Sequence, residues 1–384
     1  MGTCFEVIYH CCAGLDVHRA TIWACRRRIG TPGAVEQEVR PFPTTTAGLR
    51  RLAAWLEREG VMVVAMESTG VYWKPVFNIL EGRLPVILVN AQHLKKVPGR
   101  KSDVIDCQWI AQLLQCGLLK ASFIPPLAIR QLRDLTRRRT QLARERAGVV
   151  NRIQKVLEDA NLKLAGVASD ILGASGRAML TALSRGATDP VALAEMARKA
   201  LRQKIPALKE ALDGLTDDHH RFLLRKALEQ VDALEGLIED LSDRIEEVMA
   251  QEPLASARRR SRTIPGVGAT AAEVIVAEIG TDMGQFPSAG HLSSWAGISP
   301  GQDQSGKRRR PAKTTKGSQW LRTVLVQAAW AASRSKGTIF QRQYARLSPR
   351  LGRKKALIAV AHRILTVAYL LLERGQDYEE PKVA

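Results

Sequence analysis

The chain of 384 residues is 45% hydrophobic and carries a formal net charge of +20 at pH 7. This length predicts two or three domains, and such an excess of positive charge is typical of proteins that bind a polyanion such as nucleic acid. The sequence contains no signal-peptide pattern, no lipidation motif and no apolar run of transmembrane length. We therefore expect a cytoplasmic protein without a membrane partner.

The six cysteines all lie in the first third of the chain: Cys4, Cys11, Cys12, Cys25, Cys107 and Cys116. Their spacing matches neither a zinc ribbon nor a redox pair. We expect buried thiols in a reducing compartment. The alternative is a metal site at the adjacent cysteines and nearby histidines, although adjacent cysteines suit tetrahedral coordination poorly.

The chain begins with a pattern typical of three antiparallel strands. Residues 12–28 alternate between apolar and polar side chains and predict two strands joined by a tight turn near His18. Residues 35–42 alternate again and predict a third strand. Asp16 lies inside the first strand, where a structural role and a functional role are both open.

Helices and buried strands alternate in the next stretch. Residues 45–59 predict an amphipathic helix, and residues 61–66 form a continuous apolar run that predicts a strand buried on both faces. This strand ends at Glu67, and open α/β sheets place their functional sites at the carboxyl ends of such strands. A helix over residues 72–80 and a strand over residues 85–89 follow.

Two aspartates open the next predicted helix, which runs from residue 103 to about residue 115. Asp103 and Asp106 stand three residues apart in its first turn, behind a Pro-Gly turn and the candidate N-cap Ser102. Two carboxylates this close repel each other, and the helix N-terminus, Arg100 and Lys101 offset only part of that repulsion. A divalent cation would offset more, whereas the simpler alternative is a solvated helix start with two capping acids.

The order of elements places four acids in a recognisable layout. Three antiparallel strands followed by helix, strand, helix, strand and helix is the order of the α/β ribonuclease-H-like fold, in which acids from two strands and a helix converge on two metal ions. Phosphodiester cleavage uses two cations roughly 3.5–4 Å apart, held by oxygen ligands. We therefore predict a Mg²⁺ site formed by Asp16, Glu67, Asp103 and Asp106.

The middle of the chain is helical. Leucine, valine and isoleucine recur every seven residues through 127–164, with Arg139 and Arg146 interrupting the seam, and through 217–250 without interruption. These heptads predict a coiled coil, either between the two segments of one chain or between protomers. Arg137 and Arg138 are candidates for phosphate contact, and a solvated bundle helix is an equally good alternative for them.

The last third opens with a basic run and a glycine turn. Arg258, Arg259 and Arg260 precede the sequence IPGVG, in which Gly266 and Gly268 would let backbone N–H groups approach a phosphate at a helix N-terminus. This pattern resembles the helix-hairpin-helix element of DNA-binding proteins. A plain turn is the alternative.

A second basic loop lies between residues 296 and 318. Ser305 and a glycine precede all of its cations, which are Lys307, Arg308, Arg309, Arg310, Lys313 and Lys316. Serine is a weak nucleophile unless its proton is removed and charge on the phosphate is stabilised. The residues alone therefore favour phosphate binding by a basic loop over covalent catalysis.

Six short motifs together resemble one family: GLDVH (14–18), ESTG (67–70), KSDVID (101–106), IPGVG (264–268), AGISP (296–300) and SGKRR (305–309). Their order and spacing are similar to those of the DEDD transposases of the IS110 group of insertion sequences. The resemblance implies a RuvC-like domain at 1–124, a helical coiled-coil domain at 125–255, and a mainly α C-terminal transposase domain at 256–384.

The resemblance also implies functional roles. Asp16, Glu67, Asp103 and Asp106 would bind Mg²⁺, and Ser305 would attack DNA phosphate. GISP stands where the family more often has GLxP, so Ser299 and Ser318 remain rivals to Ser305. The implied partners are donor and target DNA, a guide (bridge) RNA, and further copies of the chain in dimers and tetramers with shared sites, acting at the nucleoid.

Two other functions remain open at this point. One is a RuvC-like nuclease or site-specific DNA invertase that acts without RNA. The other is a non-catalytic architectural protein that binds DNA through its charge and its hairpin, although four acids in this order would repel phosphate unless metal intervenes.

Overall fold

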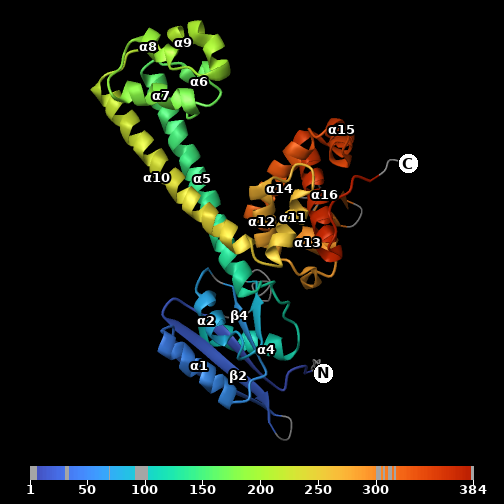
Figure 1. Ribbon diagram of the computed structural model, residues 1–384. Coiled ribbons are helices and arrows are strands. Elements are labelled where there is room, and N and C mark those ends of the chain that lie inside the picture. Colours follow the sequence, from blue (N-terminus) through green and yellow to red (C-terminus); the bar gives the residue numbers. More distant parts are fainter. Residues whose placement is uncertain are drawn as a thin grey trace. The chain divides into compact units, whose positions relative to one another are not determined.

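A computed structural model of the protein describes residues 7–30, 34–68, 70–90, 103–299, 304–305, 308–309, 314 and 317–381, without the side chains of residues 103, 104, 304, 305, 308 and 309 (Figure 1). The chain divides into two compact units, Met1–Ile124 and Pro125–Ala384. One boundary predicted from the sequence coincides with this division. The other, between residues 255 and 256, lies inside the second unit.

The first unit contains a five-stranded mixed sheet in the order β3-β2-β1-β4-β5. Its strands are β1 (Cys11–Val17), β2 (Thr21–Ile29), β3 (Val35–Pro43), β4 (Val63–Glu67) and β5 (Val86–Val89). The first three are antiparallel neighbours, whereas β4 runs parallel to β1, and β5 runs parallel to β4. These directions confirm the ribonuclease-H-like layout predicted from the sequence.

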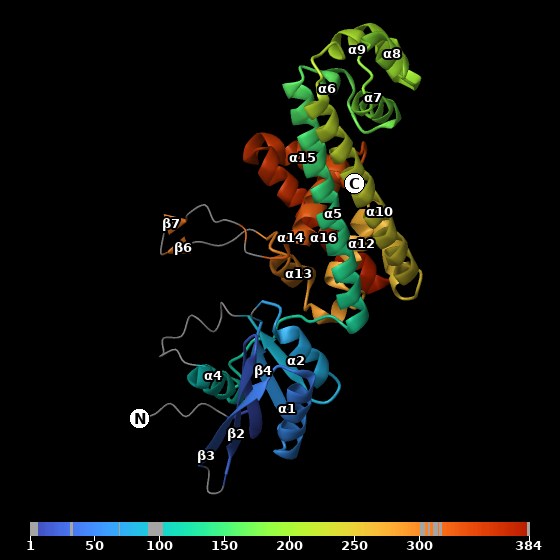
Figure 2. The same ribbon diagram turned by 90° about the vertical axis from the view of Figure 1, so that its left-hand side faces the viewer.

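Helices cover both faces of this sheet. Figure 2 shows α1 (Thr46–Arg58) and α2 (Trp73–Leu80) on one side and α4 (Asp103–Gln115) on the other. Because side chains alternate along a strand, the strands have two apolar faces. Leu15 belongs to the cluster under α1 and α2, and Cys12 belongs to the cluster under α4.

Helix α4 approaches the central strand very closely at Gly14. A Cβ atom built on Gly14 would lie 2.4 Å from the backbone nitrogen of Ala111 and 2.4 Å from the carbonyl oxygen of Cys107. Both contacts are with backbone atoms, which cannot turn away as a side chain can. Glycine is therefore the residue that lets α4 rest on the sheet.

We expect Gly14→Ala to lower the free energy of unfolding by about 1–3 kcal/mol, because overpacking against fixed backbone forces the helix outward. Gly236→Ala is the matched control, since its Cβ would meet no atom within 4 Å and α10 favours alanine. Urea unfolding of both variants checks this. Equal stability of Gly14→Ala and the unmodified chain would contradict the close packing.

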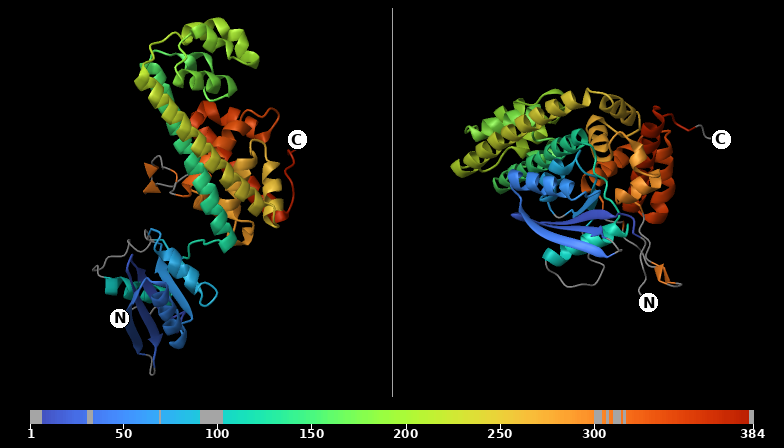
Figure 3. Two further views of the ribbon diagram at one scale, coloured as in Figure 1. Left: turned by 60° about the vertical axis from the view of Figure 1, so that its left-hand side comes forward. Right: turned by 90° about the horizontal axis from the view of Figure 1, so that it is seen from below.

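A two-helix stem opens the second unit (Figure 3). Helix α5 (Leu127–Asp159) packs along α10 (Asp218–Met249). The end of α5 meets the start of α10, where His220 Nε2 lies 3.2 Å from Asp159 Oδ2, so the two helices are antiparallel. The heptads therefore pair within one chain, which is one of the two predicted alternatives.

The interruptions in the heptad seam are filled by ion pairs. Arg146 reaches Glu235 of α10, with Nε 2.7 Å from Oε1, and Arg139 reaches Glu273 of the C-terminal bundle, with Nη2 2.6 Å from Oε2. Each arginine is thus matched by a carboxylate rather than by an apolar side chain, and the apolar residues on the two sides of Arg139 belong to separate clusters. Helix α5 ends five residues before the predicted residue 164, at a turn in which Asn161 has a φ of 54°.

Short helices cover the end of the stem at which α5 ends and α10 begins. They are α6 (Leu164–Val167), α7 (Ala174–Ser184), α8 (Pro190–Glu195), the 3₁₀ helix η1 (Lys199–Lys204) and α9 (Ile205–Ala211). Their buried leucines join those of α5 and α10 in one core.

The rest of the second unit is a helical bundle. Its elements are α11 (Leu254–Arg262), α12 (Ala269–Ile279), η2 (Met283–Gln285), α13 (Ala289–Trp295), β6 (Gln304–Ser305), β7 (Arg308–Arg309), α14 (Gln319–Ala332), α15 (Ile339–Leu351) and α16 (Arg353–Arg374). Helix α16 is long and apolar enough to cross a membrane by length and composition. It packs against α11, α13, α14 and α15, and its Val360, Ile364 and Leu365 are fully buried.

Candidate functional site

Two of the four predicted acids lie at the ends of neighbouring strands. Leu15 of β1 is the register partner of Met66 of β4, so Asp16 and Glu67 are the next residues along these parallel strands. Register partners in parallel strands project to the same face of a sheet. Asp16 is 9% exposed and Glu67 is partly buried. Two carboxylates therefore share one edge of the sheet.

This shared face is the one that α4 covers. Cys12 Sγ lies 3.5 Å from the carbonyl oxygen of Ala111, and Gly14 meets both Ala111 and Cys107. Residues of β1 that are nearer to Asp16 therefore contact residues that are nearer to the start of α4. The first turn of α4, with Asp103 and Asp106, therefore lies at the same end of the sheet as the two strand acids.

The environment of Cys107 agrees with this geometry. A hydrogen bond with Cys25 and burial raise the pKa of the Cys107 thiol far above its ordinary value, and the negative charge of Asp16 raises it further. Cys107 is therefore a neutral thiol at physiological pH. Cys12, Cys25 and Cys107 are buried thiols that form no disulfide within the described part of the chain, as predicted for packing residues.

His18, which the sequence suggested only as an alternative metal ligand beside the adjacent cysteines, contacts the first acid. His18 Nε2 lies 2.9 Å from Asp16 Oδ2, across the tight turn that follows β1. The Asp-x-His spacing at the end of a strand could have predicted this contact, because residues two apart on an extended chain lie on the same face. This contact restricts the orientation of the Asp16 carboxylate.

The donor set suits a hard divalent cation. Carboxylate oxygens are the ligands that Mg²⁺ takes in proteins, and three of the four predicted acids have described side chains: Asp16, Glu67 and Asp106. Within the described part of the chain, no group of three or more His, Cys, Asp or Glu side chains stands close enough to hold a metal ion. The Asp103 side chain lies outside that part.

The three candidate serines differ in their surroundings. Ser305 lies in β6, opposite Arg308 of β7, and its side chain is outside the described residues. Ser299 follows α13 and is partly buried. Ser318 is the N-cap of α14, and its hydroxyl donates to Glu278 Oε2 over 2.9 Å. The Ser318 hydroxyl therefore stabilises the start of α14 and its contact with α12.

Four of the arginines predicted to contact phosphate form ion pairs with acidic side chains of the protein. The pairs are Arg137 with Glu278, Arg138 with Glu145, Arg258 with Glu246, and Arg259 with Asp377. A phosphate would compete with a carboxylate for each guanidinium. Arg260 has a buried Nε atom without a hydrogen-bond partner among the described residues.

Several predicted nucleic-acid contacts fall outside the described residues: Arg100, Lys101, Lys307, Arg310, Lys313 and Lys316, together with the side chains of Arg308 and Arg309.

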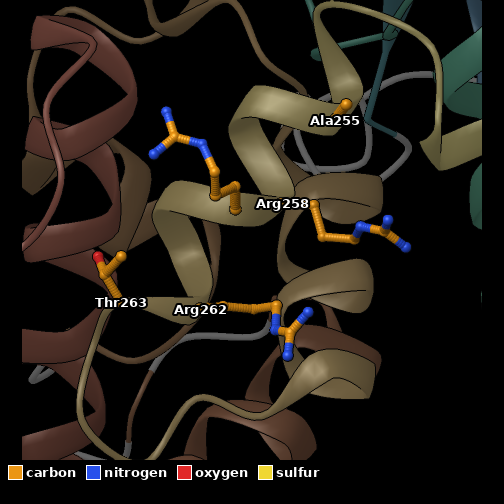
Figure 4. A pocket seen from close by; sticks show the side chains of 5 residues that line it. Ala255, Arg258, Arg262 and Thr263 are labelled. Carbon is orange, nitrogen blue, oxygen red and sulfur yellow. The ribbon is translucent and has the colours of Figure 1, made fainter.

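A cavity of about 330 Å³ opens beside α11 (Figure 4). It is lined by Ala255, Arg258, Arg259, Arg262 and Thr263. Hydrogen bonding to Arg258 lowers the pKa of Glu246, and the nearby charge of Arg262 lowers it further. Part of the positive charge around this cavity is therefore balanced within the protein.

The two glycines of the predicted hairpin have different roles. A Cβ atom on Gly266, whose φ is 84°, would lie 2.5 Å from Ala328 O and 2.5 Å from Ala332 N. Gly266 thus docks the turn against α14. Gly268 is the N-cap of α12, and a Cβ atom there would meet nothing within 4 Å. The open side of the hairpin is therefore at Gly268.

Two protein-family models match the chain. The model DEDD_Tnp_IS110, described as "Transposase", matches residues 13–162, which include the four acids. A second model, described as "Transposase IS116/IS110/IS902 family", matches residues 258–345, which include Ser305.

Similar proteins extend these matches along the chain. The "Transposase for insertion sequence element IS1111A" of Coxiella burnetii is 26% identical over 329 residues, covering 82% of this chain and 79% of the relative. A "Probable family 20 transposase" of Pseudomonas aeruginosa is 25% identical and covers 95% of this chain and 94% of the relative. Among solved structures, Thermus thermophilus RuvC is similar with a TM-score of 0.23 and 17% identity, covering 29% of this chain and 99% of that chain.

Proposed function

Because the chain belongs to the IS110 family of transposases, we propose that it cuts and rejoins donor and target DNA with Mg²⁺ and a serine nucleophile. In this proposal residues 1–124 form the metal-binding domain, residues 125–255 form the helical stem, and residues 256–384 carry Ser305. The enzyme acts in the cytoplasm at the nucleoid, where its DNA substrate is found.

The observation that carries this proposal is the strand register that sets Asp16 beside Glu67 on the face covered by α4. Carboxylates in one neighbourhood repel one another, so their grouping favours a cationic ligand. Asp16, Glu67, Asp103 and Asp106 would hold the metal. Bound Mg²⁺ supplies electrostatic stabilisation of the attacking and leaving oxygens in phosphoryl transfer.

The protein's own residues divide the remaining work. His18 orients the carboxylate of Asp16 through their hydrogen bond. Ser305 Oγ, once its proton is removed, attacks the phosphorus of a DNA phosphodiester and forms a phosphoserine ester, while the bond to the departing sugar oxygen breaks and that oxygen takes a proton. A sugar hydroxyl of the other strand then displaces Ser305 and completes strand exchange.

We also propose a guide (bridge) RNA and self-association. The net charge of +20 is what remains when every acidic side chain is counted against a basic one. This positive excess suits contact with both DNA and RNA. Phe222, Leu223 and Leu237 remain exposed on α10 although α10 is already paired with α5. These apolar side chains offer a surface for a dimer and then a tetramer.

Recombination between a donor DNA carrying the element's ends and a target DNA tests the proposal. We expect joined products only with Mg²⁺ and with a transcript of the element's non-coding end, and we expect chelation of the metal to abolish them. Equal products without the transcript would favour an RNA-independent nuclease or invertase. No Mg²⁺-dependent cleavage under any condition would favour an architectural DNA-binding protein.

A further inference from the structure

Among the described residues of the bundle, the most completely buried carboxylate is that of Glu278, near the end of α12. Glu278 is 0% exposed. Arg137 donates two hydrogen bonds to this carboxylate, from Nε to Oε1 at 2.6 Å and from Nη2 to Oε2 at 2.8 Å. A buried carboxylate is tolerated only when it is paired in this way, and removing one partner is strongly destabilising. The position of Glu278 is therefore closely determined.

The stem holds the same end of α12 through a second arginine. Arg133 Nε donates to the carbonyl oxygen of Ala277 over 2.9 Å, and Arg133 Nη2 donates to the carbonyl oxygen of Glu278. Carbonyls at the end of a helix lack partners within the helix, and a cation there also complements the helix dipole. Burial lowers the pKa of Arg133 to about 10, so it stays charged at neutral pH.

On its other side Glu278 meets Ser318. The Ser318 hydroxyl donates to Glu278 Oε2 over 2.9 Å and accepts from the backbone nitrogen of Leu321 over 3.3 Å, so it caps α14. Ser318 is also the residue at which the segment carrying Ser305 enters α14. One carboxylate thus joins the stem helix, α12 and the end of that segment.

Two neighbouring contacts fasten the same end of the segment. A Cβ atom on Gly317 would lie 2.3 Å from the carbonyl carbon of Ala296, so only glycine fits against the turn after α13. Arg322 Nη1 donates to the hydroxyl of Thr314 over 2.9 Å. The chain leaving β7 is therefore held at Thr314, Gly317 and Ser318.

We propose that Glu278 is a positioning residue for Ser305: through Ser318 and Arg137 it fixes the point from which the segment carrying the nucleophile extends. This inference rests on the proposed function, in which Ser305 attacks DNA. An error of about 1 Å in the placement of a reacting group can cost roughly 100-fold in rate. Hydrogen bonds to a charged group are the strong ones, which suits Glu278 to this task.

The test separates positioning from stability. Glu278→Gln keeps the shape of the side chain but removes the charge that Arg137 and Ser318 share. We expect the single-turnover rate of protein–DNA adduct formation, at saturating donor DNA, target DNA and transcript, to fall about 10- to 100-fold. The dissociation constant for donor DNA should stay within about twofold, because no described contact of Glu278 faces outward.

Glu273→Gln is the matched control. Glu273 lies on the same helix α12 and pairs with the same stem helix, with Arg139 Nη2 2.6 Å from Glu273 Oε2 and both residues under one-tenth exposed. The ion-pair partners of Glu273 are Arg139 and Arg258, so its carboxylate is tied to arginines and not to Ser318. We expect this variant to lower the melting temperature as much as Glu278→Gln does and yet to form the adduct at nearly the rate of the unmodified chain.

Ser318 supplies a second, milder pair of variants. Ser318→Thr retains a hydroxyl that can cap α14 and reach Glu278, so we expect adduct formation close to that of the unmodified chain. Ser318→Ala should slow it about as much as Glu278→Gln. The double variant should be no slower than the slower single variant, since both changes break one linkage.

The possible failures can be told apart. If the unmodified chain forms an adduct and Glu278→Gln is slowed no more than Glu273→Gln, the positioning role is overturned while the proposed function stands. Should Glu278→Gln fail to fold, a normal rate in Ser318→Ala would overturn it equally. If the unmodified chain forms no adduct, Ser305 is not a nucleophile and both proposals are overturned.

Discussion

Ser305→Ala is expected to abolish strand exchange, lowering adduct formation by at least about 1,000-fold, while nucleic-acid binding stays near that of the unmodified chain. Alanine removes the one oxygen that would bond to phosphorus and leaves the surrounding cations in place. The adduct is measured on denaturing gels with labelled donor DNA. Binding is measured by a mobility shift with the same DNA.

Ser299, one of the two rival serines, supplies the control for this experiment. Ser299→Ala makes the same chemical change at a partly buried position after α13, and it should retain strand exchange if Ser305 is the nucleophile. Full recombination by Ser305→Ala would remove Ser305 from the mechanism. Loss in Ser299→Ala, with retention in Ser305→Ala, would move the nucleophile to Ser299.

Asp103→Asn is expected to abolish Mg²⁺-dependent DNA cleavage, again by at least about 1,000-fold. The amide has nearly the shape of the carboxylate but lacks the negative charge that binds and orients a hard cation. Asp240→Asn is the control for the chemistry of the change, because Asp240 is exposed on α10 and far along the chain from the four acids. Unchanged cleavage by Asp103→Asn would contradict the metal assignment.

A second measurement on Asp103→Asn does not depend on catalysis. A ligand that binds only the folded state raises its stability, so Mg²⁺ should raise the melting temperature of the unmodified chain more than that of the variant. Without Mg²⁺ the variant should melt at the higher temperature, because in the proposed site Asp103 adds to the repulsion among the carboxylates of the folded state. The same melting temperatures for both proteins with and without Mg²⁺ would argue against a shared metal site.

Local pattern was sufficient for most of the first unit. The alternation over residues 12–28 and 35–42 and the apolar runs before Glu67 and over residues 85–89 correspond to strands β1 to β5. Each pattern records which faces of an element are buried, and that information lies within a few neighbouring residues. The heptads predicted α5 and α10 for the same reason, but they could not decide whether the two helices pair within one chain.

Some features carried a weak or conflicting local signal. Helix α11 is largely arginine and serine and lacks the regular apolar spacing by which a helix is recognised. Helix α15 has that spacing, at Phe340, Tyr344, Leu347 and Leu351, but its Pro349 argues against a helix. The two-residue ladder of β6 and β7 is also too short to show alternation. These elements form because the bundle around α16 buries their few apolar residues, such as Phe340 of α15.

The sequence by itself determined which residues could perform chemistry: acids at the ends of adjacent elements, a serine before a basic run, and glycines at a turn. Only the tertiary structure decided how the arginines are used. Arg137, Arg139 and Arg258 look alike in the sequence, yet each reaches a carboxylate more than ten residues away, on another helix. Such pairing depends on which helices pack together, and packing is a property of the whole chain that no short stretch of residues encodes.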